Sequence, residues 1–148
     1  RAGLERVPLG TELVILHDAA RPFIAAQFVE QAIRAAQIHG GATVAVPAVD
    51  TVLEADMDEM LAATPNRTRL WSCQTPQVFR LEPFRNAHAR ALAEERHFTD
   101  DATLFKHYGG RVKIVNGSTE NRKITTEDDL RYAEYRLHAI SQNAQQSG

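Results

Sequence analysis

The stretch Glu12-Leu-Val-Ile-Leu-His17-Asp18-Ala-Ala-Arg21-Pro22 passes from an apolar, β-rich run to polar and charged residues. A continuously apolar strand is typical of a parallel sheet that is covered on both faces. In open α/β sheets, ligands bind beyond the carboxyl ends of the strands, where Asp18 and Arg21 would lie. A carboxylate there can hold a metal or a ribose, and an arginine can grip a phosphate. From spacing alone, a turn closed by Asp18 and a solvated Arg21 explains these residues equally well.

Strand and helix patterns alternate along the rest of the chain. Pro47 cannot donate to a central ladder, so we expect the chain to leave the sheet there and the segment 47–73 to protrude. The alternation predicts an α/β layered domain with a mostly parallel sheet. Strands are expected at 12–17, 42–46 and 111–115, and the legs of the protrusion at 49–53 and 69–73. Helices are expected at 28–39 and 81–96, and from a Thr99 cap to about Tyr108. A last helix should begin at a Thr126 cap, and its buried stripe should consist of Leu130, Ala133, Leu137 and Ile140.

The composition is that of one ordinary globular domain. The chain has 148 residues and a formal net charge of -2, which argues against binding to nucleic acid because such proteins concentrate positive charge. No apolar run approaches the roughly 18 residues that a membrane span requires, so no membrane association is expected. Cys73 is the only cysteine and residues 1–10 contain no apolar signal-peptide core, so a cytoplasmic location is the simplest expectation.

Five blocks of sequence occur in an order that resembles a known family. They are His17-Asp-Ala-Ala-Arg-Pro22, Pro47-Ala-Val-Asp-Thr51, Trp71-Ser-Cys-Gln-Thr-Pro-Gln-Val-Phe79, Thr99-Asp-Asp-Ala102 and Asn121-Arg-Lys-Ile-Thr125. This order is similar to that of the 2-C-methyl-D-erythritol 4-phosphate cytidylyltransferases of the non-mevalonate isoprenoid pathway. The resemblance implies a Rossmann-like three-layer domain with a protruding β-arm at about 47–73, and a homodimer formed through that arm. It also implies transfer of the cytidylyl group of CTP to methylerythritol phosphate, with release of pyrophosphate and with Mg²⁺ as cofactor.

The resemblance also implies a role for each matching residue. Asp18 would lie near the CTP ribose and phosphates and could contact the metal, while Arg21 would belong to the methylerythritol phosphate site. Lys123 and Arg67 would be the catalytic cations beside the substrate phosphate. The other residues implied to bind substrate are Thr51, which with Arg67 would reach across the dimer, and the site threonines Thr75 and Thr99.

Three departures from the family pattern affect this interpretation. Leu53 stands where many relatives have a lysine, and Arg122 replaces an apolar residue; neither should abolish the chemistry. The family's first strand and Gly-rich loop have no counterpart before Arg1. We therefore expect the chain to be N-terminally truncated, the C-terminal portion of a single nucleotidyltransferase domain that lacks its first strands and is inactive alone. The alternatives are a cytidylyltransferase for another alditol phosphate, such as ribitol 5-phosphate, and a noncatalytic dimerisation or binding fragment.

Overall fold

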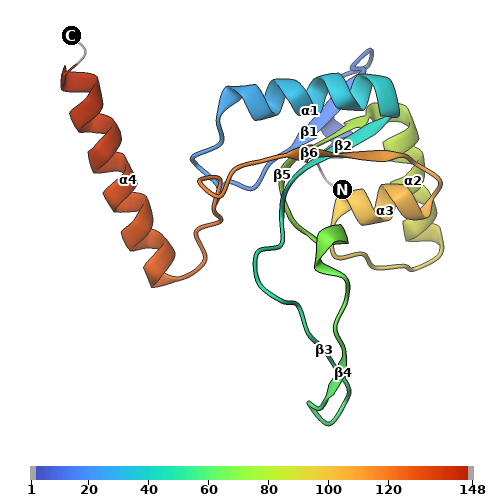
Figure 1. The fold of residues 1–148 in the computed structure, drawn as a ribbon. Coiled ribbons are helices and arrows are strands. Elements are labelled where there is room, and N and C mark those ends of the chain that lie inside the picture. Colours follow the sequence, from blue (N-terminus) through green and yellow to red (C-terminus); the bar gives the residue numbers. More distant parts are fainter. Residues whose placement is uncertain (1–2, 147–148) are drawn as a thin grey trace.

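The computed structural model describes residues 3–146, which form a four-stranded sheet with helices on both faces (Figure 1). The sheet has the strand order β1-β5-β2-β6. Its strands are β1 (Leu13–Leu16), β2 (Gly41–Pro47), β5 (Trp71–Arg80) and β6 (Val112–Asn116). The helices are α1 (Ala26–His39), α2 (Leu81–Ala93), α3 (Asp101–His107) and α4 (Glu127–Gln146), with short 3-10 turns η1 (Leu4–Arg6) and η2 (Arg67–Arg69).

A mostly parallel sheet is expected from the sequence, and β1, β2 and β6 do run in one direction. The expectation is wrong for the hydrogen-bonded strand pairs, however, because most of these pairs are antiparallel. β5 lies between β1 and β2 and is antiparallel to both, whereas only β2 and β6 pair in parallel. The chain leaves the sheet at the end of β2 and re-enters at that same end, so β5 has to run back. β1 is accordingly an edge strand within residues 3–146, and Ile15 is 44% exposed, so its expected coverage on both faces is also wrong.

Pro76 lies inside β5, in a part of the strand where the ladder is interrupted. The register passes from Thr43 opposite Gln77 to Ala45 opposite Cys73, so the three residues 74–76 face Val44 alone. Proline is tolerated within a sheet at such an irregularity because its missing N–H has no ladder partner there. The bulge also redirects side chains away from regular pairing, a common arrangement next to binding sites.

Two apolar clusters fill the spaces between the sheet and its helices. On one face Ala32 and Ala36 of α1 pack against Val44, Val78 and neighbouring strand residues. On the other face Phe79 stacks on Phe84 of α2, with ring centroids 4.3 Å apart, and both rings contact Phe105 of α3. Full burial of such side chains stabilises a fold by about 1.5–3 kcal/mol each. These clusters confirm the three-layer α/β arrangement.

The helix boundaries follow local signals. Gly40 ends α1 with a φ of 95°, and Gly109 follows α3 with a φ of 88°, a conformation that L-residues with a Cβ rarely adopt. The expected Thr99 cap is wrong by one residue. The carboxylate of Asp100 accepts the Thr103 N–H at 2.6 Å, because the carboxylate at this position reaches the free N–H groups of the first turn.

Helix α4 is anchored at its start and extends away from the sheet (Figure 1). The expected Thr126 cap is confirmed, because the Thr126 hydroxyl accepts the Asp129 N–H at 3.2 Å. The Asp129 carboxylate in turn accepts hydrogen bonds from the N–H and hydroxyl groups of Thr125 and Thr126, and it pairs with Arg122. These hydrogen bonds, that of the Thr125 N–H foremost, hold the pKa of Asp129 well below its usual range. The buried stripe is wrong except for Ala133, since Leu130, Leu137 and Ile140 are about half exposed and no element described in residues 3–146 covers them.

A segment protrudes from the sheet, but it is shorter than the expected 47–73. The expected leg 69–73 is wrong for residues 71–73, which pair with residues 45–47 of β2 and so belong to the sheet. The two short strands of the protruding segment, β3 (Glu54–Ala55) and β4 (Leu61–Ala63), pair antiparallel nearer the tip than the expected legs. At the base, the Ala48 N–H donates to the Leu70 carbonyl at 3.0 Å. We call residues 48–70 the arm.

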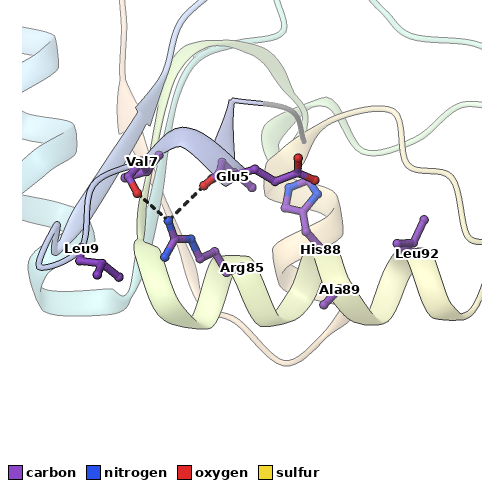
Figure 2. A pocket seen from close by; sticks show the side chains of 8 residues that line it. Glu5, Val7, Leu9, Arg85, His88, Ala89 and Leu92 are labelled. Atoms are coloured by element: carbon purple, nitrogen blue, oxygen red, sulfur yellow. Dashed lines mark hydrogen bonds between the residues drawn. The ribbon is translucent and has the colours of Figure 1, made fainter.

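The N-terminal segment packs on α2 (Figure 2). One guanidinium nitrogen of Arg85 donates to the carbonyls of Leu4 and Val7, at 3.0 Å each. Between this segment and α2 lies an open, largely apolar hollow of about 510 Å³. Within residues 3–146, no helix is long and apolar enough to cross a membrane.

Candidate active site

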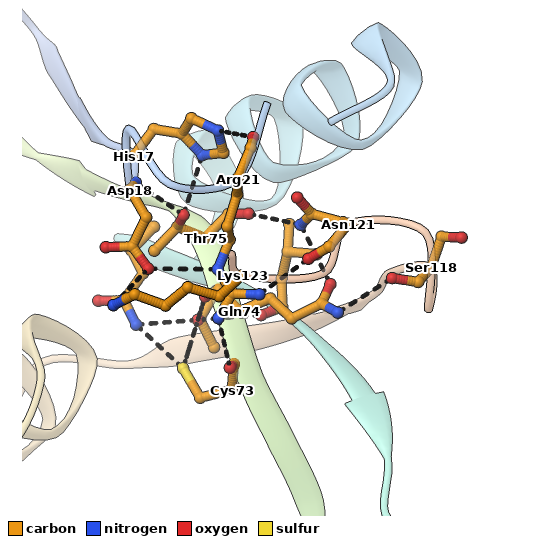
Figure 3. Close-up of polar contacts among 12 residues, drawn as sticks. His17, Asp18, Arg21, Cys73, Gln74, Thr75, Ser118, Asn121 and Lys123 are labelled. Carbon is orange, nitrogen blue, oxygen red and sulfur yellow. Dashed lines mark hydrogen bonds and ion pairs between the residues drawn. The ribbon is translucent and has the colours of Figure 1, made fainter. Parts of the chain in front are cut away.

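A polar cavity of about 480 Å³ lies beyond the carboxyl end of β1. Four chain segments line it: the loop after β1, the bulge of β5, the start of α3 and the loop after β6 (Figure 3). It brings together five of the residues that the sequence singles out, namely Asp18, Arg21, Thr75, Thr99 and Lys123. The site is therefore built where an α/β sheet is expected to bind its ligand.

Asp18 organises the charges of this cavity. Its Oδ2 lies 3.2 Å from Arg21 Nε and 3.2 Å from Lys123 Nζ. Partial burial disfavours the ionised carboxylate, but the hydrogen bonds and charges of Lys123 and Arg21 outweigh it, so the pKa of Asp18 lies below its ordinary value. Within this cluster, one carboxylate and two cations leave a net positive charge, which favours an anionic ligand. The carboxylates of Asp100 and Asp101 also line the cavity; Asp100 accepts the Thr103 N–H, and Asp101 lies 3.0 Å from His88 Nε2.

Arg21 is held firmly, whereas Lys123 is more accessible. Arg21 donates from Nε to Asp18, from Nη1 to the Asn121 carbonyl at 2.8 Å and from Nη2 to the Cys73 carbonyl at 3.5 Å. A guanidinium has five N–H donors, so two remain for a ligand. The Arg21 side chain is only 12% exposed and that of Lys123 is 46% exposed. Arg21 is thus a preoriented donor at the cavity wall, and Lys123 is a cation that can move towards a ligand.

Thr75 is tied to the loop after β1 through His17. The His17 Nε2 lies 3.0 Å from the Arg21 carbonyl, which can only accept, so neutral His17 carries its proton on Nε2. The Thr75 hydroxyl then donates to His17 Nδ1 at 2.9 Å and accepts the Asp18 N–H at 2.9 Å. The Thr75 hydroxyl oxygen therefore keeps one lone pair that can accept a hydrogen bond from a ligand. To donate its proton to a phosphate, the hydroxyl would have to break its hydrogen bond to His17. Its role in substrate binding stays a prediction.

Thr51 and Arg67 are not brought into this cavity. Both lie on the arm, where Arg67 donates to the Val49 carbonyl at 2.8 Å and so joins the two sides of the arm. Their contact with substrate across a dimer stays a prediction. Sequence reasoning also missed three residues that build the site, His17, Gln74 and Asn121, although all three stand inside the quoted blocks.

Cys73 and Trp71, near the start of β5, are both exposed. The Cys73 thiol is exposed and lines the cavity, where Gln77 Nε2 donates to Sγ at 3.2 Å. Trp71 is 39% exposed at the base of the arm. Both residues precede the bulge of β5.

Asp18 is poorly suited to hold Mg²⁺ without further ligands, because its Oδ2 is already paired with two cations. Mg²⁺ requires near-octahedral oxygen ligands and is usually held by one or two carboxylates together with substrate phosphates. In the described part of the chain, no group of three His, Cys, Asp or Glu side chains is placed to hold a metal ion. These residues do not fit a resident Mg²⁺, and binding of the ion stays a prediction.

Comparison with known proteins agrees with this geometry. The family model for IspD, 2-C-methyl-D-erythritol 4-phosphate cytidylyltransferase, matches residues 1–139. The enzymes of that name from Bacillus licheniformis and Caldanaerobacter subterraneus are 46% and 43% identical to the chain over 132 residues, which is 89% of the chain. The crystal structure of 4-diphosphocytidyl-2C-methyl-D-erythritol synthase from Anaerococcus prevotii superimposes with a TM-score of 0.86 at 34% identity, and covers 93% of this chain and 64% of that one.

A three-layer α/β sheet with a polar cavity at its strand ends defines a Rossmann-like domain. Within that class, the chain belongs to the 2-C-methyl-D-erythritol 4-phosphate cytidylyltransferase family. It spans 57% and 58% of the lengths of the two curated relatives.

Proposed function

We propose that the protein represented by this chain transfers the cytidylyl group of CTP to 2-C-methyl-D-erythritol 4-phosphate and releases pyrophosphate. One observation carries the proposal: Asp18, Arg21 and Lys123, which the family pattern assigns to the substrate site, form one charge cluster in one cavity. The cluster has a net positive charge and remaining N–H donors. It suits a phosphate monoester, which is the part of the acceptor that must be bound and oriented.

In the proposed reaction, an oxygen of the acceptor phosphate attacks the α-phosphorus of CTP in line. A new P–O bond forms there as the bond between the α-phosphorus and the bridging oxygen breaks, and the electron pair leaves with pyrophosphate. Lys123 and Arg21 would bind the acceptor phosphate, and Asp18 would keep both cations in place. Mg²⁺ is proposed to arrive on the CTP triphosphate rather than to reside on Asp18.

We further propose that the arm forms a homodimer and carries Thr51 and Arg67 to the partner's site. The arm exposes apolar side chains without cover, including Met57, Met60 and Leu61. An isolated two-stranded ribbon is marginally stable in water, so a second copy that covers these side chains would stabilise it. Sedimentation should show a dimer for the wild type and a monomer for Leu61→Asp. Leu9→Asp, at a 96% exposed site outside the arm, should leave the dimer intact. A monomeric wild type at high concentration would contradict this proposal.

Two other functions make different predictions. A ribitol 5-phosphate cytidylyltransferase would prefer that acceptor, whereas the proposed function predicts tighter binding of methylerythritol phosphate, as measured by isothermal titration calorimetry. A noncatalytic dimerisation or binding fragment would show no cytidylyl transfer even in a protein of the relatives' full length. The proposed site also suggests that the chain alone releases no pyrophosphate from CTP, because its sequence holds no Gly-rich, Lys-containing loop to bind the triphosphate. We also propose a cytoplasmic location, in keeping with the single cysteine of the sequence, Cys73.

A further inference from the structure

Asn121 has a buried side chain within hydrogen-bond reach of several parts of the site (Figure 3). The residue is 1% exposed. Its Nδ2 donates to the Thr75 carbonyl at 2.8 Å and to Gln74 Oε1 at 3.1 Å. The main-chain carbonyl of Asn121 accepts a hydrogen bond from Arg21 Nη1 at 2.8 Å. Asn121 thus contacts the bulge of β5 with its side chain and the loop after β1 with its main chain.

The same residue sets the start of the segment that carries Lys123. The Asn121 N–H donates to the Ser118 carbonyl at 3.1 Å, and Gln74 Nε2 donates to that carbonyl at 3.0 Å. The chain is held again at the residue that follows Lys123, where the Ile124 N–H donates to the Ala20 carbonyl at 2.8 Å. Lys123 therefore lies between two fixed points, and Asn121 is the first of them.

We propose that Asn121 is a positioning residue, which holds Arg21 and Lys123 on either side of Asp18 so that both cations can meet one acceptor phosphate. The inference rests on the proposed function for the identity of that phosphate. Asn121 itself need not touch substrate, because its side-chain donors are directed at Thr75 and Gln74.

The hydrogen-bond pattern explains why an amide N–H₂ suits this position. Both partners of Nδ2 are acceptors, a main-chain carbonyl and Gln74 Oε1. Gln74 cannot turn its amide round to compensate, since its Nε2 is already used on the Ser118 carbonyl. An aspartate would place a carboxylate oxygen against two acceptors, and an alanine would leave both unpaired in a buried place.

The test compares Asn121→Ala with Asn86→Ala, the same substitution at an exposed position of α2. Two quantities are measured: the Kd for methylerythritol phosphate, by isothermal titration calorimetry, and the pKa of the Asp18 carboxyl, by ¹³C NMR. We expect Asn121→Ala to raise the Kd at least tenfold and to shift the pKa of Asp18 upwards, because Arg21 and Lys123 move away from the carboxylate. Asn86→Ala should change neither quantity. Gln74→Ala, which removes one partner of Asn121, should produce a smaller change in the same direction.

The two measurements separate this inference from the proposed function. If the wild type does not bind methylerythritol phosphate, the proposed function fails, and the pKa of Asp18 still decides the role of Asn121. An unchanged Asp18 pKa in a cooperatively melting Asn121→Ala protein would overturn the inference. Loss of the cooperative melting transition in both Asn121→Ala and Gln74→Ala would also overturn it, since the pair would then be needed for the fold itself.

Discussion

Replacing Lys123 with glutamine should weaken acceptor binding strongly while leaving stability almost unchanged. The side chain is 46% exposed, so its ion pair with Asp18 is partly screened and contributes at most about 1 kcal/mol to the free energy of unfolding. A charge-assisted hydrogen bond from Lys123 to a bound phosphate contributes about 1.5–3 kcal/mol. Since 1.4 kcal/mol is a factor of ten, the Kd for methylerythritol phosphate should rise roughly 10- to 150-fold.

The assay is isothermal titration calorimetry of Lys123→Gln and wild type, with thermal melting by circular dichroism as the measure of stability. Lys113→Gln is the matched control, because Lys113 is exposed on β6 and does not line the cavity. We expect it to keep the wild-type Kd. A Kd of Lys123→Gln within twofold of the wild type would refute the assignment of Lys123 to the phosphate. A large fall in melting temperature would refute the claim that the ion pair is weak.

Three further changes test other parts of the structure. Asp129→Asn should lower the melting temperature at pH 6, because the ionised Asp129 carboxylate is stabilised in the folded state. Since the native pKa of Asp129 is depressed, the difference in melting temperature from wild type should shrink as the pH falls below about 3.9, the pKa of an aspartate in the unfolded chain. A difference that stays constant down to pH 2 would contradict this. Gly110→Ala should lower the free energy of unfolding, measured by urea denaturation, by about 1–3 kcal/mol, because the new Cβ would lie 2.5 Å from the Phe105 ring. Gly3→Ala is the control and should be neutral, since a Cβ there has no neighbour within 4 Å. Arg67→Ala in an active protein of the relatives' full length should lower kcat/KM for the acceptor with little change in melting temperature, and an unchanged kcat/KM would remove Arg67 from the site.

Helices and their ends could be predicted because their signals are local. The apolar stripes of α1 and α2 and the glycines after α1 and α3 act within a few residues, and the structure places these elements close to their expected ranges. The stripe of α4 shows the limit of such reasoning. Periodicity identifies an apolar face, but it does not say which element covers that face.

Long-range features were harder to derive. Pro76 argues against a central strand, and only the bulge opposite Val44 explains how β5 accommodates it there. The quoted blocks bring Asp18, Arg21 and Lys123 to one cavity, as expected. The hydrogen bond between Asn121 and Gln74 joins residues 47 positions apart, and no local pattern marks two amides as partners at that distance.

The base of the arm allows its length to vary independently of the sheet. Pro47 pairs with Trp71, and the Ala48 N–H donates to the Leu70 carbonyl, so both ends of the excursion are fixed next to each other. Insertions or deletions beyond that point leave the register of β2 and β5 unchanged. Doubling the length of a flexible loop costs only about 0.6 kcal/mol in closure entropy. Evolution or protein engineering can therefore remodel the arm, by shortening it, extending it or grafting a different sequence, without rebuilding the cavity.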